Sequence, residues 1–423
     1  MGNSNQIDVP KIEMKKIIRN NFLHAYQVNP EGGIIYVDNK VKEWLESFEG
    51  DGYLEKSSKE NSIYEKITRS GFSETPFSIP KRKLPKISVI LVLYNSKLWI
   101  ENLEKMFNSL SDWLYEIVVV DNGSTDNCLI ELEKRIKKIK KIQFHSSQSF
   151  ASAVNHGVNN AIGDLFLIIN PDIFITKSAL LSLINSYFEN INVGAISPKL
   201  LLMRLPGFLN GIGNIVQPFY HGYDLGLGHL DLGQFDHITR LQSACFATIL
   251  IPKESWIAVG ELDESYPMYY EDADWCYRAN DKGKPIIFSP ESKVYHAFRD
   301  YSSDDKVRIN SEKIYNITFG RGRFIRKNLN KKNRFLFSFS YCIYDVVVSI
   351  YQLIFHQKNI ASIIMKARTD CRKNSPKFFA ENNSDRINKE FLEKQILASL
   401  EPKIKNGKPV LIINDLKKII LKN

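Results

Sequence analysis

The sequence predicts an open α/β fold: a mostly parallel sheet flanked by helices, with a small α+β module before it and a helical region after it. Near-continuous apolar runs at 87–93 ("ISVILVL"), 117–120 ("IVVV") and 165–169 ("LFLII") are typical of parallel strands that helices cover on both faces. Stretches with helical spacing separate these runs. Strands that alternate with helices in this way form open parallel sheets.

The connecting segments can be assigned in chain order. Apolar residues at helical spacing predict two helices, the first with Leu103, Met106, Phe107 and Leu110, the second with Leu129, Leu132, Ile136 and Ile139. A short strand is expected at 142–145 ("IQFH"), followed by a helix over 150–162. No GxGxxG or GxxxxGK motif occupies a strand-to-helix turn, which argues against a dinucleotide-binding fold and a P-loop.

Changes in composition divide the chain into 1–85, 86–300 and 301–423. The first part contains a predicted strand in "GGIIYVD" and helices in "NKVKEWLESFEG" and "SIYEKITRSGF". It resembles a small winged-helix-like module, and a structural extension of the main domain explains it as well. The basic linker "PKRKLPK" marks the first boundary, and "PVLIIND" near the carboxyl end reads as an added strand.

The overall composition limits the class of protein. The 423 residues carry a net charge of +10, which favours an anionic partner such as a nucleotide, a phospholipid surface, a nucleic acid or an acidic glycan. Five scattered cysteines with no CxxC pair argue against a zinc ribbon or a disulfide framework, and suit a reducing compartment. The polar start "MGNSNQIDVP" has no signal-peptide core, so a cytoplasmic location is expected.

Two aspartates directly follow predicted strands. Asp121 comes after 117–120, and Asp172 lies in "NPD" after 165–169, where Pro171 must end the strand. The carboxyl ends of parallel strands share one edge of the sheet, where ligands bind. Mg²⁺ typically takes one or two carboxylates together with substrate phosphates, a role that fits Asp172. Asp121 taken alone is equally explained as a turn residue, and Asp126 as a helix-capping residue.

A second acidic cluster lies in "MYYEDADWCYR". Glu271, Asp272 and Asp274 crowd three carboxylates into four positions, among Tyr270 and Trp275. Crowded carboxylates raise one another's pKa, which suits a general base that accepts a proton near neutral pH. After "IIFSPESKVY" comes His296, either a structural histidine or a neutral nitrogen ligand of a metal.

Taken in order, these stretches resemble family 2 glycosyltransferases with the GT-A fold, most closely the rhamnosyltransferase and galactofuranosyltransferase branches. The resemblance covers about residues 86–300. "ISVILVLYN" is similar to the first strand and its turn, "EIVVVDNGSTD" to the nucleoside-binding turn, and "FASAVNHG" to the helix under the donor. "NPD" is similar to the variant DXD metal motif, and "YYEDADWCYR" to the catalytic-base motif.

The resemblance implies an inverting, metal-dependent enzyme that moves a sugar from a UDP- or dTDP-sugar to a hydroxyl of a glycan, lipid-linked or peptide acceptor, in cell-surface polysaccharide synthesis. The implied donor-binding residues are Tyr94, Asn95, Asp121, Asn122, Asn155, Asn170 and Asp172. Asp172 and His296 would hold Mg²⁺ or Mn²⁺, and Asp272 would be the base, with Glu271 and Asp274 beside it. The implied acceptor-binding residues are Tyr270, Trp275 and Arg278.

The chain departs from the family pattern at four positions. Ser147 and Ser149 stand where the family usually has Asn and Gly, Glu261 replaces a second glycine, and Leu93 replaces a threonine. These departures bear on the identity of the donor more than on catalysis, because the metal and base positions are intact.

The carboxyl region raises the question of a membrane. Seven basic residues and no acid lie between 321 and 334, followed by the apolar stretch 335–355. Asp345 in mid-span argues against a membrane-crossing helix. One polar stripe contains Ser338, Asp345, Ser349, Gln352 and His356. The pattern predicts an amphipathic helix, which suits an anionic membrane surface and a peripheral location on its inner face. A helix packed against the catalytic domain, or against a second copy in a homo-oligomer, explains the pattern equally well.

Two other functions compete with glycosyl transfer. A sugar-phosphate nucleotidyltransferase is disfavoured because no glycine-rich, basic loop follows the first strand. A non-catalytic nucleic-acid-binding or scaffold protein would use the basic charge, but it leaves the strand-end aspartates and the carboxylate cluster unexplained.

Overall fold

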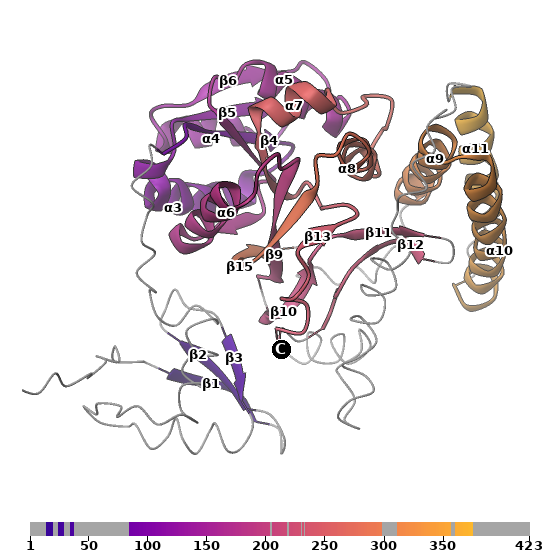
Figure 1. The fold of residues 1–423 in the computed structure, drawn as a ribbon, viewed down its shortest axis with the longest axis horizontal. Helices are drawn as coiled ribbons and strands as arrows, with labels where there is room; N and C mark the ends of the chain where they lie inside the picture. The colour runs from indigo at the N-terminus through magenta and orange to yellow at the C-terminus, as the bar shows by residue number, and fades with distance from the viewer. Residues whose placement is uncertain are drawn as a thin grey trace, which may run out of the picture.

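The computed structural model describes residues 14–19, 24–28, 34–37, 84–297 (apart from 204, 218, 219, 230 and 232), 311–356 and 360–374. Its centre is a ten-stranded sheet with the order β13-β15-β9-β14-β7-β4-β5-β6, with β10 beside β9 and β8 beside β15 (Figure 1). The strands of this sheet are β4 (Ile87–Leu93), β5 (Glu116–Asp121), β6 (Lys140–Gln143), β7 (Leu165–Ile169), β8 (Ile173–Ile175), β9 (Ala195–Leu202), β10 (Leu205–Gly211), β13 (Arg240–Leu241), β14 (Thr248–Pro252) and β15 (Ile286–His296).

The predicted open α/β fold is confirmed, and its parallel part is the first half of the chain. Strands β7, β4, β5 and β6 pair in parallel throughout. Beyond β7 the sheet is mixed, because β14 enters antiparallel between β7 and β9, whereas β15 runs parallel to β9. The expectation of a mostly parallel sheet therefore holds for 87–169 and not for the strands that follow.

Helices cover both faces of the sheet. They are α3 (Ile100–Leu110), α4 (Cys128–Arg135), α5 (Phe150–Asn159), α6 (Lys177–Glu189), α7 (Lys253–Val259) and α8 (Glu271–Asp281). Alternate residues of β4 enter different cores: Val89 and Leu91 pack with α3, α4 and α6, while Ile90 and Val92 pack with α5, α7 and α8. A Cβ on Gly157 of α5 would lie 2.5 Å from Cγ2 of Ile90, so only glycine permits this close approach of helix to strand.

Two connecting elements differ from the prediction. The second helix ends at Arg135, and Ile136 is extended (φ −120°, ψ 109°), so the predicted helical stripe stops halfway. Ile136 and Ile139 still pack against the core, from a non-helical segment. The following strand is Lys140–Gln143 rather than 142–145. The apolar spacing therefore predicted correctly that Ile136 and Ile139 pack against the core, and it predicted wrongly that they lie in a helix.

The carboxyl region is helical as predicted in its described parts, 311–356 and 360–374, and its first helix packs beside α8 (Figure 1). It contains α9 (Ser311–Asn328), α10 (Lys331–His356) and α11 (Ala361–Asn374). One apolar cluster joins the two regions, with Tyr266 and Tyr270 from the sheet domain, Phe324 from α9 and Tyr341 from α10. The strand expected in "PVLIIND" lies outside the described residues.

Two small antiparallel units complete the fold. The hairpin β11 (Asn214–Gln217) and β12 (Tyr220–Asp224) precedes β13 and β14. Near the amino end, β1 (Met14–Arg19), β2 (His24–Val28) and β3 (Ile34–Val37) form a separate sheet, and β3 is the strand expected in "GGIIYVD". The helices predicted for that module lie outside the described residues, so its winged-helix character stays a prediction.

Candidate functional site

The turns after β4 and β5 are tied together at the carboxyl edge of the sheet. The side-chain oxygen of Asn95 accepts a hydrogen bond from the backbone N–H of Thr125 (2.8 Å), and the Asn95 N–H donates to Oγ of Ser124 (3.0 Å). The Asp121 carboxylate accepts from the Ser124 N–H (3.0 Å). Gly123 has φ +75°, and a Cβ there would lie 2.7 Å from the backbone of Ser146, so this turn requires glycine. The turns after β4 and β5 are therefore held together as one surface, which we call the ledge.

The ledge presents a mixture of exposed and buried groups. Asp121 is 2% exposed and Tyr94 is 54% exposed. The carboxylate of Asp126 accepts from the N–H of Cys128, the first residue of α4, and from that of Lys97. This is the capping role expected for Asp126, although the residue precedes the N-cap position, Asn127, by one.

Two of the four asparagines expected to bind the donor, Asn122 and Asn155, hold protein segments instead. Asn122 exchanges two hydrogen bonds with the backbone of Gln148. Asn155 is 1% exposed; its amide bonds both backbone groups of Leu262 and also donates to Glu264. A side chain so fully used inside the protein cannot contact a donor, so the assignment of Asn155 is wrong. Asn155 fixes the loop before α8.

The strand break at "NPD" brings Asp172 to His296. Strand β7 ends at Ile169, the Asn170 N–H donates to the carbonyl of Ala247, and β8 then pairs antiparallel with the end of β15. This pairing sets the Asp172 carboxylate 3.2 Å from Nε2 of His296. The two residues, 124 positions apart in sequence, meet as the resemblance implied.

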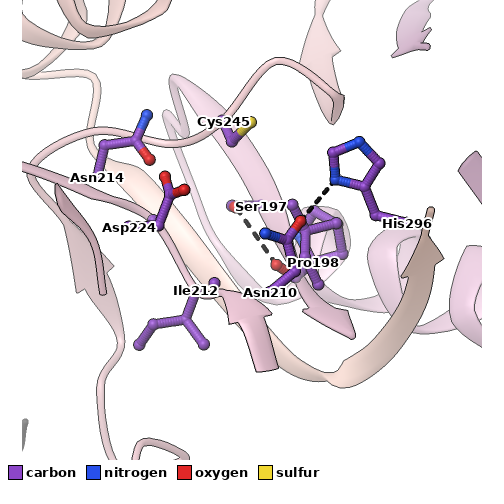
Figure 2. A pocket seen from close by; sticks show the side chains of 11 residues that line it. Ser197, Pro198, Asn210, Ile212, Asn214, Asp224, Cys245 and His296 are labelled. Carbon is purple, nitrogen blue, oxygen red and sulfur yellow. Dashed lines mark hydrogen bonds between the residues drawn. The ribbon is translucent and has the colours of Figure 1, made fainter. Parts of the chain in front are cut away.

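A third residue orients the imidazole. Nδ1 of His296 lies 2.5 Å from the side-chain oxygen of Asn210, which can only accept, so Nδ1 carries the proton (Figure 2). Nε2 is then left to face Asp172. A hydrogen bond at one ring nitrogen that aims the other is the usual arrangement around a metal-binding histidine.

The pair fits a divalent cation. A carboxylate oxygen and an imidazole nitrogen that face each other at 3.2 Å need a proton or a cation between them. Within the described residues no third His, Cys, Asp or Glu joins this pair. Mg²⁺ and its relatives are commonly held by so few protein groups, because substrate phosphates and water complete the coordination.

Asp272 stands at the start of α8 beside Glu271. Its carboxylate accepts from the amide of Asn214 (3.3 Å) and from the N–H of Ala273 (2.7 Å). Burial raises the pKa of both carboxyls, and the charge of Asp272 adds to the effect on Glu271, whose pKa stands higher. Glu271 is 7% exposed, and its Oε2 has no hydrogen-bond partner in the described part of the chain. Glu271 therefore keeps its proton to higher pH, and Asp272 is the one that ionises first.

The two carboxylates follow a strained turn. Tyr269 and Tyr270 have φ values of +70° and +73°, a region that bulky residues avoid, at a cost of about 1–3 kcal/mol each. Helix α9 holds them there. The ring of Tyr270 packs 6.1 Å from that of Phe324, and a Cβ on Gly320 would lie 2.7 Å from the Tyr269 carbonyl. The carboxyl-terminal helices thus position the proposed base.

The remaining residues of this motif are structural. Asp274 is fully buried, and Trp275 is fully buried with its Nε1 donating to the Gly260 carbonyl. Arg278 donates to Asp274 and to the carbonyls of Val259 and Glu261. These positions contradict the acceptor-binding assignment of Trp275 and Arg278.

Tyr270 is 7% exposed and belongs to the apolar cluster, so it too is placed away from an acceptor. The aromatic residues around the acidic motif build its support. Their place in the sequence reflects packing and not recognition.

Asp274 organises a buried polar network. Its carboxylate accepts from Arg278, Lys327 and Asn328 at 2.8–2.9 Å, and from the Tyr266 hydroxyl at 3.3 Å. It is therefore saturated by protein partners, and it orders the site rather than taking part in the chemistry.

We expect Asp274→Ala to destabilise the fold by about 3–5 kcal/mol, because the change removes the buried centre of the network and leaves the partly buried Arg278 and Lys327 without this partner. Urea unfolding would measure the loss. Glu101→Ala, which removes the exposed pair with Lys105, serves as the control and should cost less than about 1 kcal/mol. Equal losses in the two variants would contradict the structural role of Asp274.

Three residues of the site, Asp224, Asn210 and Asn214, could not be predicted from the sequence. Asp224 ends β12 directly opposite Asn214, and it lines a pocket with Asn214, Asn210, Cys245 and His296 (Figure 2). Burial, and next the charge of Asp272, raise the pKa of Asp224 to about 6. The pocket is therefore lined both by Asn214, which donates to Asp272, and by His296, which pairs with Asp172. Asp224 follows no apolar strand in sequence, and the only local signal is the pair of glycines at 226 and 228.

Part of the sheet domain is similar to a known family of enzymes. Residues 88–198 match the family model described as Glycosyl transferase family 2. The chain is 26% identical over 259 residues to the low-salt glycan biosynthesis hexosyltransferase Agl10 of Haloferax volcanii, covering 59% of this chain and 78% of that protein. It is 24% identical over 225 residues to the dTDP-rhamnosyl transferase RfbF of Shigella flexneri, covering 51% of this chain and 70% of that protein.

Among solved structures, the chain is similar to residues 1–349 of TarS from S. aureus in complex with UDP-GlcNAc. The TM-score is 0.43 at 19% identity, covering 69% of this chain and 82% of that one. At that distance the similarity carries no inference about ligands.

Proposed function

We propose, from the match of residues 88–198 to glycosyltransferase family 2, that the protein is an inverting, divalent-metal-dependent transferase. The donor is a nucleoside-diphosphate sugar, and the acceptor is a hydroxyl group of a glycan or glycoconjugate. The observation that carries the proposal is one pocket lined by a partner of each proposed functional carboxylate. His296 lines it and pairs with Asp172, and Asn214 lines it and donates to Asp272.

The donor would lie across the carboxyl edge of the sheet. The ledge built by Asn95, Asp121 and Thr125 offers a buried carboxylate and fixed backbone groups for the nucleoside. Asp172 and His296 would hold Mg²⁺ or Mn²⁺ against the diphosphate. When bound, the ion supplies positive charge that stabilises the leaving nucleoside diphosphate as the glycosidic bond breaks.

Asp272 would act on the acceptor. Its carboxylate takes the proton of the attacking hydroxyl, and the hydrogen bond from Asn214 holds the receiving oxygens in place. Because Glu271 keeps its own proton to higher pH, it stays neutral beside the ionised Asp272. A single base and direct attack on the anomeric carbon predict inversion of configuration.

Two similar proteins bear on the class of donor and on the product. One is a dTDP-rhamnosyl transferase and the other a glycan biosynthesis hexosyltransferase, which supports a hexose or deoxyhexose donor and a role in glycan biosynthesis. A dTDP- or UDP-sugar is accordingly the proposed donor.

A thermal-shift panel of nucleotide sugars, with and without Mn²⁺, tests the proposal. A ligand that binds the native state raises the melting temperature by mass action, by an amount equivalent to about 2.7 kcal/mol at 100 times the dissociation constant. One donor should produce a metal-dependent shift. No shift for any nucleotide sugar, together with salt-sensitive retention on DNA, would replace this proposal with the nucleic-acid-binding alternative.

The rate should depend on pH through the base. Burial raises the pKa of Asp272 to about 6, and only the ionised carboxylate can accept a proton. We therefore expect kcat/KM to rise about tenfold per pH unit below pH 6 and to level off above it. Initial rates between about pH 5 and 8 would show this. A rate that is unchanged over that range contradicts Asp272 as the base.

A further inference from the structure

Helix α10 exposes an apolar face of unusual length. Phe335, Phe339, Val346, Ile350, Leu353 and Ile354 are each at least 52% exposed. Their spacing places them on one side of the helix, which over these residues is roughly 30 Å long. In the sequence between Arg334 and His356 the only charged residue is Asp345. Apolar patches of this extent on a soluble domain mark an interaction site.

The polar side of the same helix points inward. Asp345 is 6% exposed and binds Arg321 of α9 (2.7 Å) and Arg368 of α11. The Arg321 guanidinium also lies 4.4 Å from the ring centre of Tyr341. The helix is therefore oriented by ion pairs with its neighbours, which leaves its apolar side facing outward.

We propose that the outer face of α10 lies on an anionic membrane surface, with the helix in the plane of the interface. Charge supports this occupant. Lys332 falls on the exposed stripe, seven positions before Phe339, and Lys331 beside it is exposed as well. On the neighbouring α11, Lys366 and Lys373 are exposed. An apolar face flanked by lysines matches the boundary between acyl chains and anionic headgroups.

The helix lies on the bilayer and does not cross it. The helix over 331–354 contains an 18-residue window with a mean hydropathy of 1.4, so it is long and apolar enough to span a membrane. However, a spanning helix would carry Asp345 into hydrocarbon, together with Arg321 and Arg368 of the helices that bind it. Charges at that depth are costly, whereas a helix in the interface keeps them inside the protein.

This placement brings the active site close to the lipid. Phe337 and Tyr341, on the inner face of α10, share one apolar cluster with Tyr270, which immediately precedes Glu271 and Asp272. The element that rests on the membrane therefore also packs against the turn that presents the base. Such a site suits an acceptor displayed at the membrane, which extends the proposed function without depending on it.

Vesicle flotation of the full chain tests the proposal, with phosphatidylcholine vesicles that contain or lack phosphatidylglycerol. We expect flotation with the anionic vesicles at about 0.05 M salt, and weaker flotation at about 0.5 M. Ile350→Asp should weaken binding at least about tenfold, since a charge must then be desolvated. Lys331→Glu with Lys332→Glu should weaken it about fivefold or more for each charge.

The matched control is Ile191→Asp, the same change at a position that is 95% exposed in the loop after α6. It should float like the wild type, and all variants should keep the wild-type melting temperature. Three results would overturn the proposal: no flotation of the wild type, equal flotation of Ile350→Asp, or retention after alkaline extraction, which indicates a spanning helix. A dimer in solution that Ile350→Asp dissociates, without vesicle binding, would assign the face to a second copy.

Discussion

Replacing Asp272 with asparagine should lower kcat by about 10²- to 10⁴-fold, the usual contribution of a general base. Asparagine keeps the size of the side chain and its hydrogen bonding to Asn214 and Ala273, but it cannot accept the acceptor's proton. Donor binding should be unchanged, because Asp272 contacts neither the nucleoside ledge nor the Asp172–His296 pair. Transfer rates and donor affinity, measured on the same preparation, would separate these effects.

The matched control is Asp281→Asn at the other end of α8, where the side chain is exposed. It should keep wild-type activity. The melting temperature of Asp272→Asn should not fall, since burial disfavours the ionised form of the residue that is removed. If Asp272→Asn transferred sugar at the wild-type rate with intact donor binding, Asp272 would not be the base.

Asp172→Ala should weaken Mn²⁺-dependent donor binding by at least about 100-fold. Residues that merely orient a metal ligand already cost about 10- to 100-fold when removed, and Asp172 would be a ligand itself. The lone His296 would then remain, held by Asn210 but without its carboxylate partner. Calorimetric titration of the donor, with and without Mn²⁺, would measure the change.

Asp164→Ala is the control, because Asp164 stands at the opposite end of the same strand, where it is exposed and accepts from the Lys86 N–H. It should retain the metal-dependent affinity. Donor binding that is equally strong with and without Mn²⁺ in the wild type would show that the donor does not need a metal. Unchanged binding in Asp172→Ala would show that Asp172 is not a metal ligand.

The sequence allowed the strand-end aspartates to be found because two local rules coincide there. A continuous apolar run identifies a strand that is covered on both faces, and Pro171 in "NPD" marks the residue at which that strand must stop. Asp121 and Asp172 follow such runs, and the parallel pairing of β4 with β5 and β7 places both at one edge.

What the sequence could not reveal depends on tertiary contacts. Nothing local distinguishes Asn155 as the clamp of the loop at Leu262, or Trp275 as a core residue stacked on Trp256. Asp224 and Asn210 come from the segment between β9 and β13, where no apolar period indicates a strand. They join the site because β10 pairs with β9, where Asn210 meets His296, and because the hairpin pairs Asp224 with Asn214.

Helix α10 could also be predicted only in part. The spacing of its polar residues predicts a polar stripe, but it does not predict whether that stripe faces the protein or the solvent. The ion pairs of Asp345 with Arg321 and Arg368 turn the polar side toward α9 and α11 and leave the apolar side exposed. Spacing alone cannot specify which side of an amphipathic helix meets the protein when the protein offers charges of its own.

The most direct test of the account is the release of nucleoside diphosphate from a panel of UDP- and dTDP-sugars by the wild-type protein with Mn²⁺ and a glycan acceptor. We expect one donor to release its nucleoside diphosphate in step with a glycosylated product of inverted anomeric configuration. Release of pyrophosphate from a nucleoside triphosphate, or a product of retained configuration, would contradict it.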